Sequence, residues 1–293
     1  MRRRDFFSLA SSALGASTMA RGAGRASPGD AFVENAPGCA LLFDLRSKRM
    51  LIAHGAVQAS EWLASPGSTV KPLSLWALLR AGRVKPDESI PCPHQLRLAG
   101  LSMDCSHPRL PFPVNIARAI SYSCNCTTAQ FAKRFVGDEL AQFYLRLGFE
   151  STTQLLQRNE AAGHVQKGIS GERLQLQALG ERGVRVTALE VAKAYRHMAT
   201  LVHDPEFQPI LEGMEGAVQF GTGRAAQVAG KTVAGKTGSV QTERGLHAAW
   251  FAGFAPSRDP EVVVTVLTQG RSGAEAAAPI AGELFRRYFL GES

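Results

Sequence analysis

Strand patterns lie near both ends of this chain, and helical patterns occupy most of the sequence between them. Residues 40–43 and 50–53 are short apolar runs separated by polar residues, a pattern typical of a β-hairpin. Three further strand patterns come late in the sequence, at residues 228–236, 248–255 and 262–268. Because helices do not alternate with these strands, the order favours an α+β fold with an antiparallel sheet over a parallel-sheet fold.

The middle of the chain predicts helices around one irregular segment. An apolar pattern that starts at Ser68 and stops at Gly82 predicts a buried helix. Residues 84–113 are rich in Pro and predict an irregular excursion. Further helices are predicted at residues 114–136, 138–147, 187–202 and 274–290. No stretch of 18 apolar residues occurs, which excludes a polytopic membrane protein.

The first 26 residues differ in composition from the rest. Arg2, Arg3 and Arg4 precede a Ser/Ala/Gly-rich stretch that ends in a small-residue site at Ala26. This predicts an export signal of the twin-arginine type over residues 1–26, a tether over 27–37 and one domain over 38–293. We therefore expect export to the periplasm or to the outer face of the cytoplasmic membrane.

The charge balance argues against a nucleic-acid partner. The chain carries 33 Lys and Arg against 25 Asp and Glu, a formal charge of +8. About half of that excess lies in the predicted signal, and the remainder is spread without clusters of basic residues. Nucleic-acid binding proteins concentrate such charge on one face, so we expect no nucleic-acid partner.

Three short motifs stand in a fixed order and resemble those of a known family. They are Ser68-Thr69-Val70-Lys71, Ser123-Cys124-Asn125 and Lys236-Thr237-Gly238. Chance would produce this ordered set in about one chain in a hundred or fewer. With their flanks at residues 66–72, 234–240 and 247–256, they resemble the transpeptidase domain of high-molecular-mass, class B penicillin-binding proteins. The resemblance implies a β-lactamase/transpeptidase-like fold, with a five-stranded antiparallel sheet flanked by helices and a mainly helical subdomain.

The first motif suits nucleophilic catalysis whatever its family. Three residues separate Ser68 from Lys71, so both side chains lie on one face of a helix. At the start of that helix, free backbone N–H groups would stabilise a developing oxyanion near Ser68. Lys71 must be neutral part of the time to act as a base, although an ordinary lysine has a pKa of about 10.4. Burial and a second cation, for which Lys236 is the candidate, would lower that pKa.

The resemblance assigns roles to the remaining motif residues. It implies that Ser123 relays a proton to the leaving amine and that Asn125 hydrogen-bonds the substrate amide. Lys236 and Thr237 would hold the terminal carboxylate of the substrate. The substrate would be the D-alanyl-D-alanine end of a peptidoglycan stem peptide, with β-lactams as alternative ligands and cell-wall synthesis proteins as further partners.

The strand of the third motif would complete the site. Gly238 would let the substrate backbone lie against the strand. The resemblance implies that the N–H of Ser239 pairs with that of Ser68 as the oxyanion hole. Ser68 would then be acylated, and the acyl group would pass to an amine or to water without any catalytic cofactor.

Two other functions compete with this interpretation. A β-lactamase would need a deacylating base, such as a carboxylate or a carbamylated Lys71 in an apolar pocket. The sequence offers no clear carboxylate, because the context of Glu172 resembles a penicillin-binding protein stretch, and Asn125 is not the apolar residue of the carbamate-using class. A β-lactam or muropeptide sensor would keep the same cleft without turnover.

The five cysteines leave zinc, a disulfide and free thiols as open alternatives. The odd count rules out complete internal pairing. A bond between Cys92 and Cys105 would close the irregular excursion. The alternative is a Cys3His set suited to a structural zinc, as in some relatives, in which His94 is a substitute for the histidine: Cys92, Cys105, His107 and Cys124. The other two, Cys39 and Cys126, are predicted to be small core residues.

Overall fold

The computed structural model describes residues 38–156, 158–241 and 247–291. The predicted export signal and tether, residues 1–26 and 27–37, lie outside the described residues. The predicted hairpin is confirmed as β1 (Gly38–Asp44) and β2 (Arg49–His54).

One five-stranded sheet organises the domain. Its remaining strands are β7 (Ala234–Gln241), β8 (His247–Ala255) and β9 (Val262–Gln269). The strand order is β2-β1-β9-β8-β7, and every neighbouring pair is antiparallel. The first hairpin therefore pairs with the last strand, as the predicted α+β fold with a five-stranded antiparallel sheet requires.

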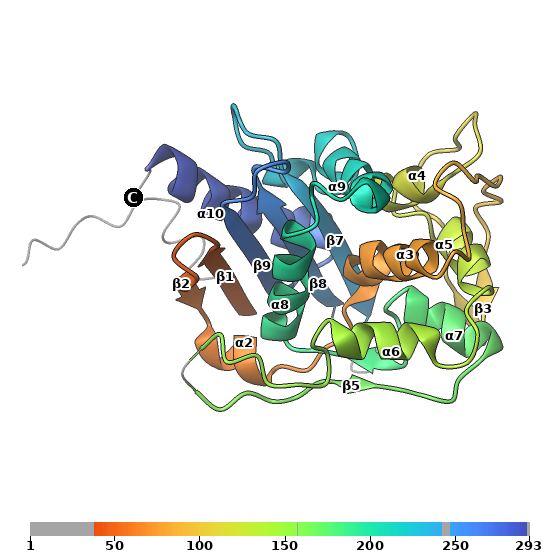
Figure 1. Ribbon diagram of the computed structural model, residues 1–293, viewed down its shortest axis with the longest axis horizontal. Helices are drawn as coiled ribbons and strands as arrows, with labels where there is room; N and C mark the ends of the chain where they lie inside the picture. The colour runs from red at the N-terminus through yellow and green to blue at the C-terminus, as the bar shows by residue number, and fades with distance from the viewer. Residues whose placement is uncertain (1–37, 157, 242–246, 292–293) are drawn as a thin grey trace, which may run out of the picture.

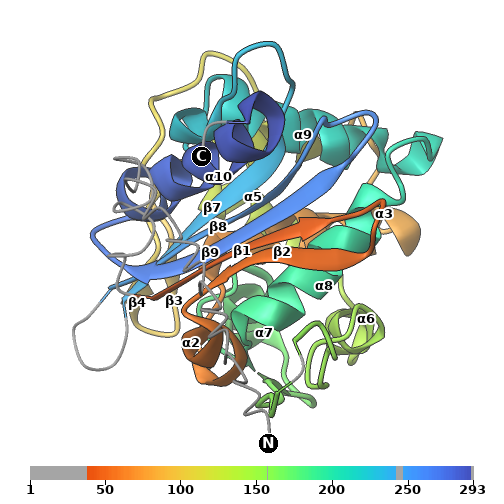
Figure 2. The same ribbon diagram turned by 90° about the vertical axis from the view of Figure 1, so that its left-hand side faces the viewer.

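Helices cover both faces of this sheet. Helix α10 (Ala278–Leu290) lies on one face, and α8 (Ala188–Ala199) with α2 (Ala56–Glu61) lies on the other (Figures 1 and 2). Neighbouring residues of β8 serve opposite faces, because side chains alternate along a strand. Phe251 contacts Phe285 of α10 with ring centroids 6.4 Å apart, while Trp250 belongs to the core on the other face.

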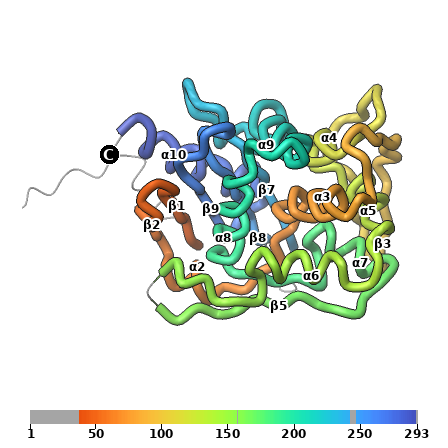
Figure 3. The backbone as a smooth tube through the Cα atoms, viewed as in Figure 1, coloured from red at the N-terminus to blue at the C-terminus, as the bar shows by residue number. Residues whose placement is uncertain are grey.

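A mainly helical region adjoins the β7 side of the sheet (Figures 1 and 3). It begins with the 3-10 helix η1 (Gly67–Val70), which continues directly into α3 (Lys71–Arg80). Its other helices are α4 (Ile116–Ser121), α5 (Asn125–Ala132), α6 (Glu139–Arg146), α7 (Gly171–Ala178) and α9 (Gln208–Gln219).

Short elements connect these parts. Two small hairpins pair β3 (Arg97–Leu98) with β4 (Leu101–Ser102), and β5 (His164–Val165) with β6 (Val184–Arg185). Single turns of 3-10 helix span Pro205–Phe207 and Arg224–Ala226, and a π-helical turn spans Gly273–Ala277. Within the described residues, no helix is both long enough and apolar enough to cross a bilayer.

Two predicted elements were wrong in their bounds. The helix predicted over residues 114–136 is two helices, because Ser123 adopts a left-handed backbone conformation with φ of 55° between them. The strand predicted over residues 228–236 begins only at Ala234, because Val228 and Lys231 form an isolated bridge across a turn. Both corrections fall next to motif residues, so they decide how the site is built.

Candidate active site

The nucleophile candidate Ser68 lies in η1, on the rim of the sheet. Gly67 enters this turn with φ of 54°, a left-handed conformation that side-chain-bearing residues rarely adopt. The turn is held from two sides. The Tyr195 hydroxyl donates to the Thr69 carbonyl at 2.8 Å, and the Trp250 indole donates to the Ser65 carbonyl at 3.0 Å. Ser68 itself remains partly exposed, as a nucleophile must be to meet a substrate.

Lys71 follows Ser68 by one turn and is fully buried. Its Nζ donates to the Ser123 carbonyl at 2.7 Å, to the Ser123 hydroxyl at 3.1 Å and to Oδ1 of Asn125. These three bonds use all three protons of an ammonium group. Burial lowers the pKa of Lys71 to about 8, so the neutral amine is accessible near neutral pH.

Lys236 reaches the same serine from β7. This lysine is also fully buried, and its Nζ donates to the Ser123 hydroxyl and to the Thr237 carbonyl, both at 3.0 Å. Burial lowers the pKa of Lys236 well below its ordinary value, and the nearby charge of Lys71 lowers it further. The left-handed conformation of Ser123 thus places one hydroxyl between two buried amines.

Strand β7 packs directly against the nucleophile turn. A Cβ atom added to Gly238 would lie 2.6 Å from the Pro66 carbonyl oxygen, so only glycine fits there. A Cβ on Gly67 would lie 3.3 Å from the Ser239 nitrogen, which places the backbones of η1 and β7 side by side. The two N–H groups expected to form the oxyanion hole, those of Ser68 and Ser239, belong to these adjoining backbones.

The eight predicted site residues therefore come together from three separate parts of the chain. They belong to η1 and α3, to the junction of α4 and α5, and to β7: Ser68, Lys71, Ser123, Asn125, Lys236, Thr237, Gly238 and Ser239. The junction is fixed by its own contacts, since Asn125 Nδ2 donates to the Met103 carbonyl at 3.0 Å. Sequence reasoning missed Thr222, whose hydroxyl is hydrogen-bonded to that of Thr237 at 2.5 Å.

Sequence reasoning also missed Glu181, a carboxylate that interacts electrostatically with Lys71. It follows Gly180, whose carbonyl accepts a hydrogen bond from the Gly67 N–H at 2.9 Å. Glu172, the carboxylate that the sequence analysis set aside, accepts instead from the Ala99 N–H at 2.6 Å. Nothing in the sequence around Glu181 marks it as a site residue, because its position near the nucleophile turn depends on tertiary packing.

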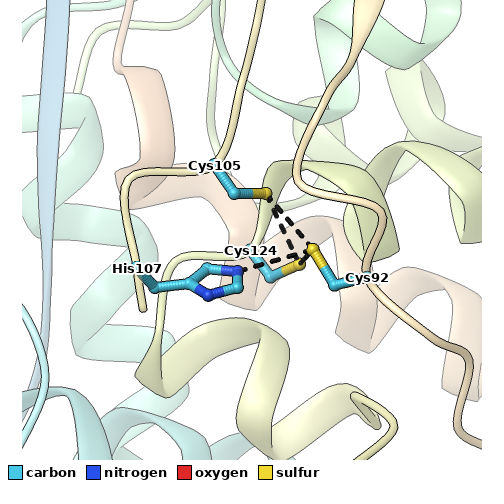
Figure 4. Close-up of side chains that lie close together, drawn as sticks. All are labelled: Cys92, Cys105, His107 and Cys124. Carbon is cyan, nitrogen blue, oxygen red and sulfur yellow. Dashed lines mark hydrogen bonds between the residues drawn. The ribbon is translucent and has the colours of Figure 1, made fainter. Parts of the chain in front are cut away.

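The cysteine and histidine cluster includes Cys124, the central residue of the second motif (Figure 4). The Sγ atom of Cys92 is 3.4 Å from Sγ of Cys124, 3.7 Å from Sγ of Cys105 and 3.6 Å from Nε2 of His107. All four ligand atoms lie within 4.8 Å of one another. A tetrahedral zinc with Zn–S bonds of about 2.3 Å separates its sulfur ligands by roughly 3.8 Å, so the cluster has suitable dimensions.

The surroundings of the cluster also suit a metal. Nδ1 of His107 lies 2.8 Å from the Pro108 carbonyl, which favours a proton on Nδ1 and a free lone pair on Nε2. All described cysteines are free thiols, and the 3.7 Å between Cys92 and Cys105 is well above a disulfide length of about 2.05 Å. Cys126 is buried, as predicted, yet its Sγ lies 3.5 Å from that of Cys105.

The fold belongs to the transpeptidase-like α+β class. Residues 38–288 match the family described as "Penicillin binding protein transpeptidase domain". The chain therefore belongs to this family, and it is related to its class B members.

The relatives agree on the family at low sequence identity. The chain is 23% identical over 262 residues to "Probable peptidoglycan D,D-transpeptidase PenA" of Neisseria flavescens, covering 78% of this chain and 64% of that protein. It is 24% identical over 292 residues to "Peptidoglycan D,D-transpeptidase MrdA" of Acinetobacter baumannii, covering 80% of this chain and 43% of that protein. The chain thus spans less than two thirds of the length of these curated relatives.

Two solved structures share the fold. The transpeptidase domain of Burkholderia pseudomallei penicillin-binding protein 3 superposes with a TM-score of 0.78 at 20% identity, covering 89% of each chain. Pseudomonas aeruginosa PBP2 superposes with a TM-score of 0.75 at 20% identity, covering 90% of this chain and 76% of that one.

Proposed function

We propose that this protein is a serine D,D-transpeptidase or D,D-carboxypeptidase. Its substrate is the D-alanyl-D-alanine end of a peptidoglycan stem peptide, and the reaction proceeds through an acyl-enzyme on Ser68. The observation that carries the proposal is the Ser123 hydroxyl, to which both buried lysines donate. Such an arrangement provides a proton route between a nucleophile and a leaving group, and a purely structural site has no need of it.

Lys71 activates the nucleophile in this scheme. With a pKa of about 8, roughly a tenth of the Lys71 side chains are neutral at pH 7. A neutral amine has two protons and one lone pair, so it gives up one of its three hydrogen bonds and accepts the Ser68 proton. The Ser68 oxygen then attacks the substrate carbonyl, and the N–H groups of Ser68 and Ser239 stabilise the oxyanion.

The second and third motifs complete the first half of the reaction. Ser123 delivers a proton to the leaving D-alanine amine and is reprotonated from a neighbouring lysine. Lys236 and Thr237 bind the terminal carboxylate of the substrate, and Asn125 orients its amide. β-Lactams acylate the same serine because their strained amide occupies the position of the D-alanyl-D-alanine bond.

Covalent labelling tests this proposal. Purified protein is incubated with a fluorescent penicillin, and the labelled fraction is followed by gel fluorescence. We expect rapid labelling of the wild type, no labelling of Ser68→Ala, and unchanged labelling of Ser102→Ala, an exposed serine outside the motifs. A stem pentapeptide then releases D-alanine in a Ser68-dependent manner. Absence of both labelling and release would favour a binding module without turnover.

The place of action follows from the same proposal. Peptidoglycan lies outside the cytoplasmic membrane, so we infer an extracytoplasmic location, reached through the export signal predicted over residues 1–26. The single domain proposed over 38–293 would work beside other cell-wall synthesis proteins. Fusion of residues 1–37 to a reporter that requires folding before export tests the route, and a reporter retained in the cytoplasm would contradict it.

We also propose that Cys92, Cys105, His107 and Cys124 hold a structural zinc. The sulfur separations of 3.4–3.7 Å match a tetrahedral site, and soft thiolates with one imidazole are ligands that zinc prefers. When bound, the metal would tie the irregular excursion to the start of α5. Because Cys124 lies between Ser123 and Asn125, this cross-link would hold the second motif in position.

Metal analysis tests the zinc proposal. Protein purified without chelators should contain close to one zinc per chain. Cys92→Ser should lose the metal, whereas Cys39→Ala, a buried cysteine outside the cluster, should retain it. Metal-free protein with a Cys92–Cys105 disulfide mapped by mass spectrometry would contradict the proposal.

A further inference from the structure

The segment that follows α7 brings a carboxylate to the nucleophile turn. The Gly180 carbonyl accepts the Gly67 N–H at 2.9 Å, and Gly67 immediately precedes Ser68. The packing is close, since a Cβ added to Gly180 would lie 2.7 Å from a Val70 methyl group. Glu181 is the next residue, so it is attached to the backbone that contacts the nucleophile.

Glu181 differs from the other carboxylates near the site because no described residue binds its carboxylate. It is partly exposed, and neither a hydrogen bond nor an ion pair joins its carboxylate to any of the residues that the structure describes. The crowded surroundings nevertheless raise the pKa of Glu181 to about 7. Burial outweighs the opposing effect of the two charges that act on it, Lys71 and then Arg182.

Other buried carboxylates near the helical region have structural partners. Glu190 accepts the N–H groups of Ser151, Gly163 and Thr187 and forms the capping box of α8. Such fully engaged groups are fixed by their bonds and have no lone pair to spare. Glu181 forms no such bonds among the described residues, so its lone pairs are available to a water molecule.

We propose that Glu181 is the general base that lets water deacylate Ser68, which makes the protein a hydrolase of its own acyl-enzyme. This inference rests on the proposed function, because it needs the Ser68 ester. The Glu181 carboxylate takes a proton from water as the water oxygen attacks the ester carbonyl. The ester C–O bond then breaks, the Lys71 ammonium protonates Ser68 Oγ, the proton taken up by Glu181 returns to Lys71, and the acyl group leaves as a carboxylic acid. The product is a trimmed stem peptide or a hydrolysed β-lactam.

The reaction requires the carboxylate to be near the ester without binding the lysine directly. The hydrogen bond between the Gly67 N–H and the Gly180 carbonyl brings the residue that carries this carboxylate to the nucleophile turn, and no ion pair joins it to Lys71 among the described residues. A base that formed a tight ion pair with Lys71 would hold that lysine in its charged state. In this scheme Lys71 takes the Ser68 proton in acylation and Glu181 takes the water proton in deacylation, and these are the two proton abstractions that hydrolysis requires.

A pulse-chase experiment tests this division of roles. The protein is labelled with a fluorescent penicillin, excess unlabelled ampicillin is added, and loss of the label is followed over hours. We expect Glu181→Gln to lengthen the lifetime of the label at least tenfold while the labelling rate changes less than threefold. Glu181→Asp, which keeps the carboxylate, should fall between the two. Glu172→Gln, whose wild-type carboxylate binds the Ala99 N–H, serves as the control and should match the wild type.

The outcomes separate this inference from the proposed function. Equal label lifetimes in the wild type and Glu181→Gln would overturn the role of Glu181 but leave the Ser68 acyl-enzyme intact. Loss of labelling in Glu181→Gln would also overturn it, because the carboxylate would then act in acylation. Failure of the wild type to label would remove the proposed function itself.

Discussion

The contact between Gly180 and the nucleophile turn predicts that the methyl group added by Gly180→Ala lowers both stability and the acylation rate. Gly180 and Gly183 both have φ of +76°, so an alanine at either position pays the same backbone penalty of about 1–2 kcal/mol. The two positions differ in the room that they leave for an added Cβ atom. A Cβ at Gly183 meets its nearest atoms at 3.5 Å, an ordinary contact, whereas a Cβ at Gly180 would lie 2.7 Å from Val70 and closer still to the Gly67 carbonyl oxygen.

The excess effect of Gly180→Ala therefore measures overpacking against η1. Relief of contacts this short requires movements of roughly 1 Å, and overpacking of this kind typically costs about 1–3 kcal/mol. We expect the free energy of unfolding to fall by about 2–5 kcal/mol in Gly180→Ala and by about 1–2 kcal/mol in Gly183→Ala. Because a displacement of this size beside a nucleophile reduces rates by about a hundredfold, the penicillin acylation rate should fall on the order of a hundredfold in Gly180→Ala alone.

Urea unfolding and acylation by a fluorescent penicillin measure the two effects. Both variants are assayed at temperatures where more than nine tenths of the protein is folded, so that loss of folded protein does not count as loss of rate. Equal acylation rates in the two variants would refute the reasoning, because they would mean that the Gly180 segment does not support Ser68.

Three further predictions concern pH and stability. Burial raises the pKa of Glu181 to about 7 and a base must be deprotonated, so label loss should accelerate about tenfold from pH 6 to 8; a flat profile would contradict this. Thr187→Ala should lower the free energy of unfolding in urea by about 1–2 kcal/mol, because its hydroxyl accepts the Glu190 N–H in the capping box. The Tyr288 hydroxyl lowers the pKa of Asp44 to about 2, so this carboxylate contributes stability above pH 4 that is lost as pH falls toward 2. In urea titrations, the loss of unfolding free energy between pH 4 and pH 2 should be about 1 kcal/mol smaller in Asp44→Asn than in the wild type. An unchanged pH dependence would argue against the interaction between Asp44 and Tyr288.

The sequence predicted the architecture where apolar periodicity was strong. The hairpin of β1 and β2, the late strands β8 and β9 and the terminal helix follow patterns that any sheet or helix of this kind imposes. The break between α4 and α5 was missed because neither Gly nor Pro marks it. Ser123 takes the left-handed conformation there, and the Cys124 side chain accepts the Thr127 N–H at the start of α5.

The motifs predicted which residues come together, but they did not predict all the charged groups around these residues. Ser68 and Lys71 are three residues apart, so their proximity is a local property of a helix. The approach of Glu181 to Lys71 has no such local cause, since it depends on how the segment after α7 packs against η1. From the sequence we expected burial and the charge of Lys236 to lower the pKa of Lys71 together. In the structure burial is the main cause for both lysines, and the interaction between them lowers the pKa of Lys236.

Peptide mapping of the β-lactam adduct tests the central claim most directly. The protein is incubated with ampicillin, denatured in acid before the ester can be hydrolysed, digested with trypsin and analysed by mass spectrometry. We predict a single modified peptide, heavier by one intact ampicillin, with fragmentation that assigns the added mass to Ser68. An adduct on any other residue, or none at a concentration that saturates known penicillin-binding proteins, would contradict a Ser68 acyl-enzyme.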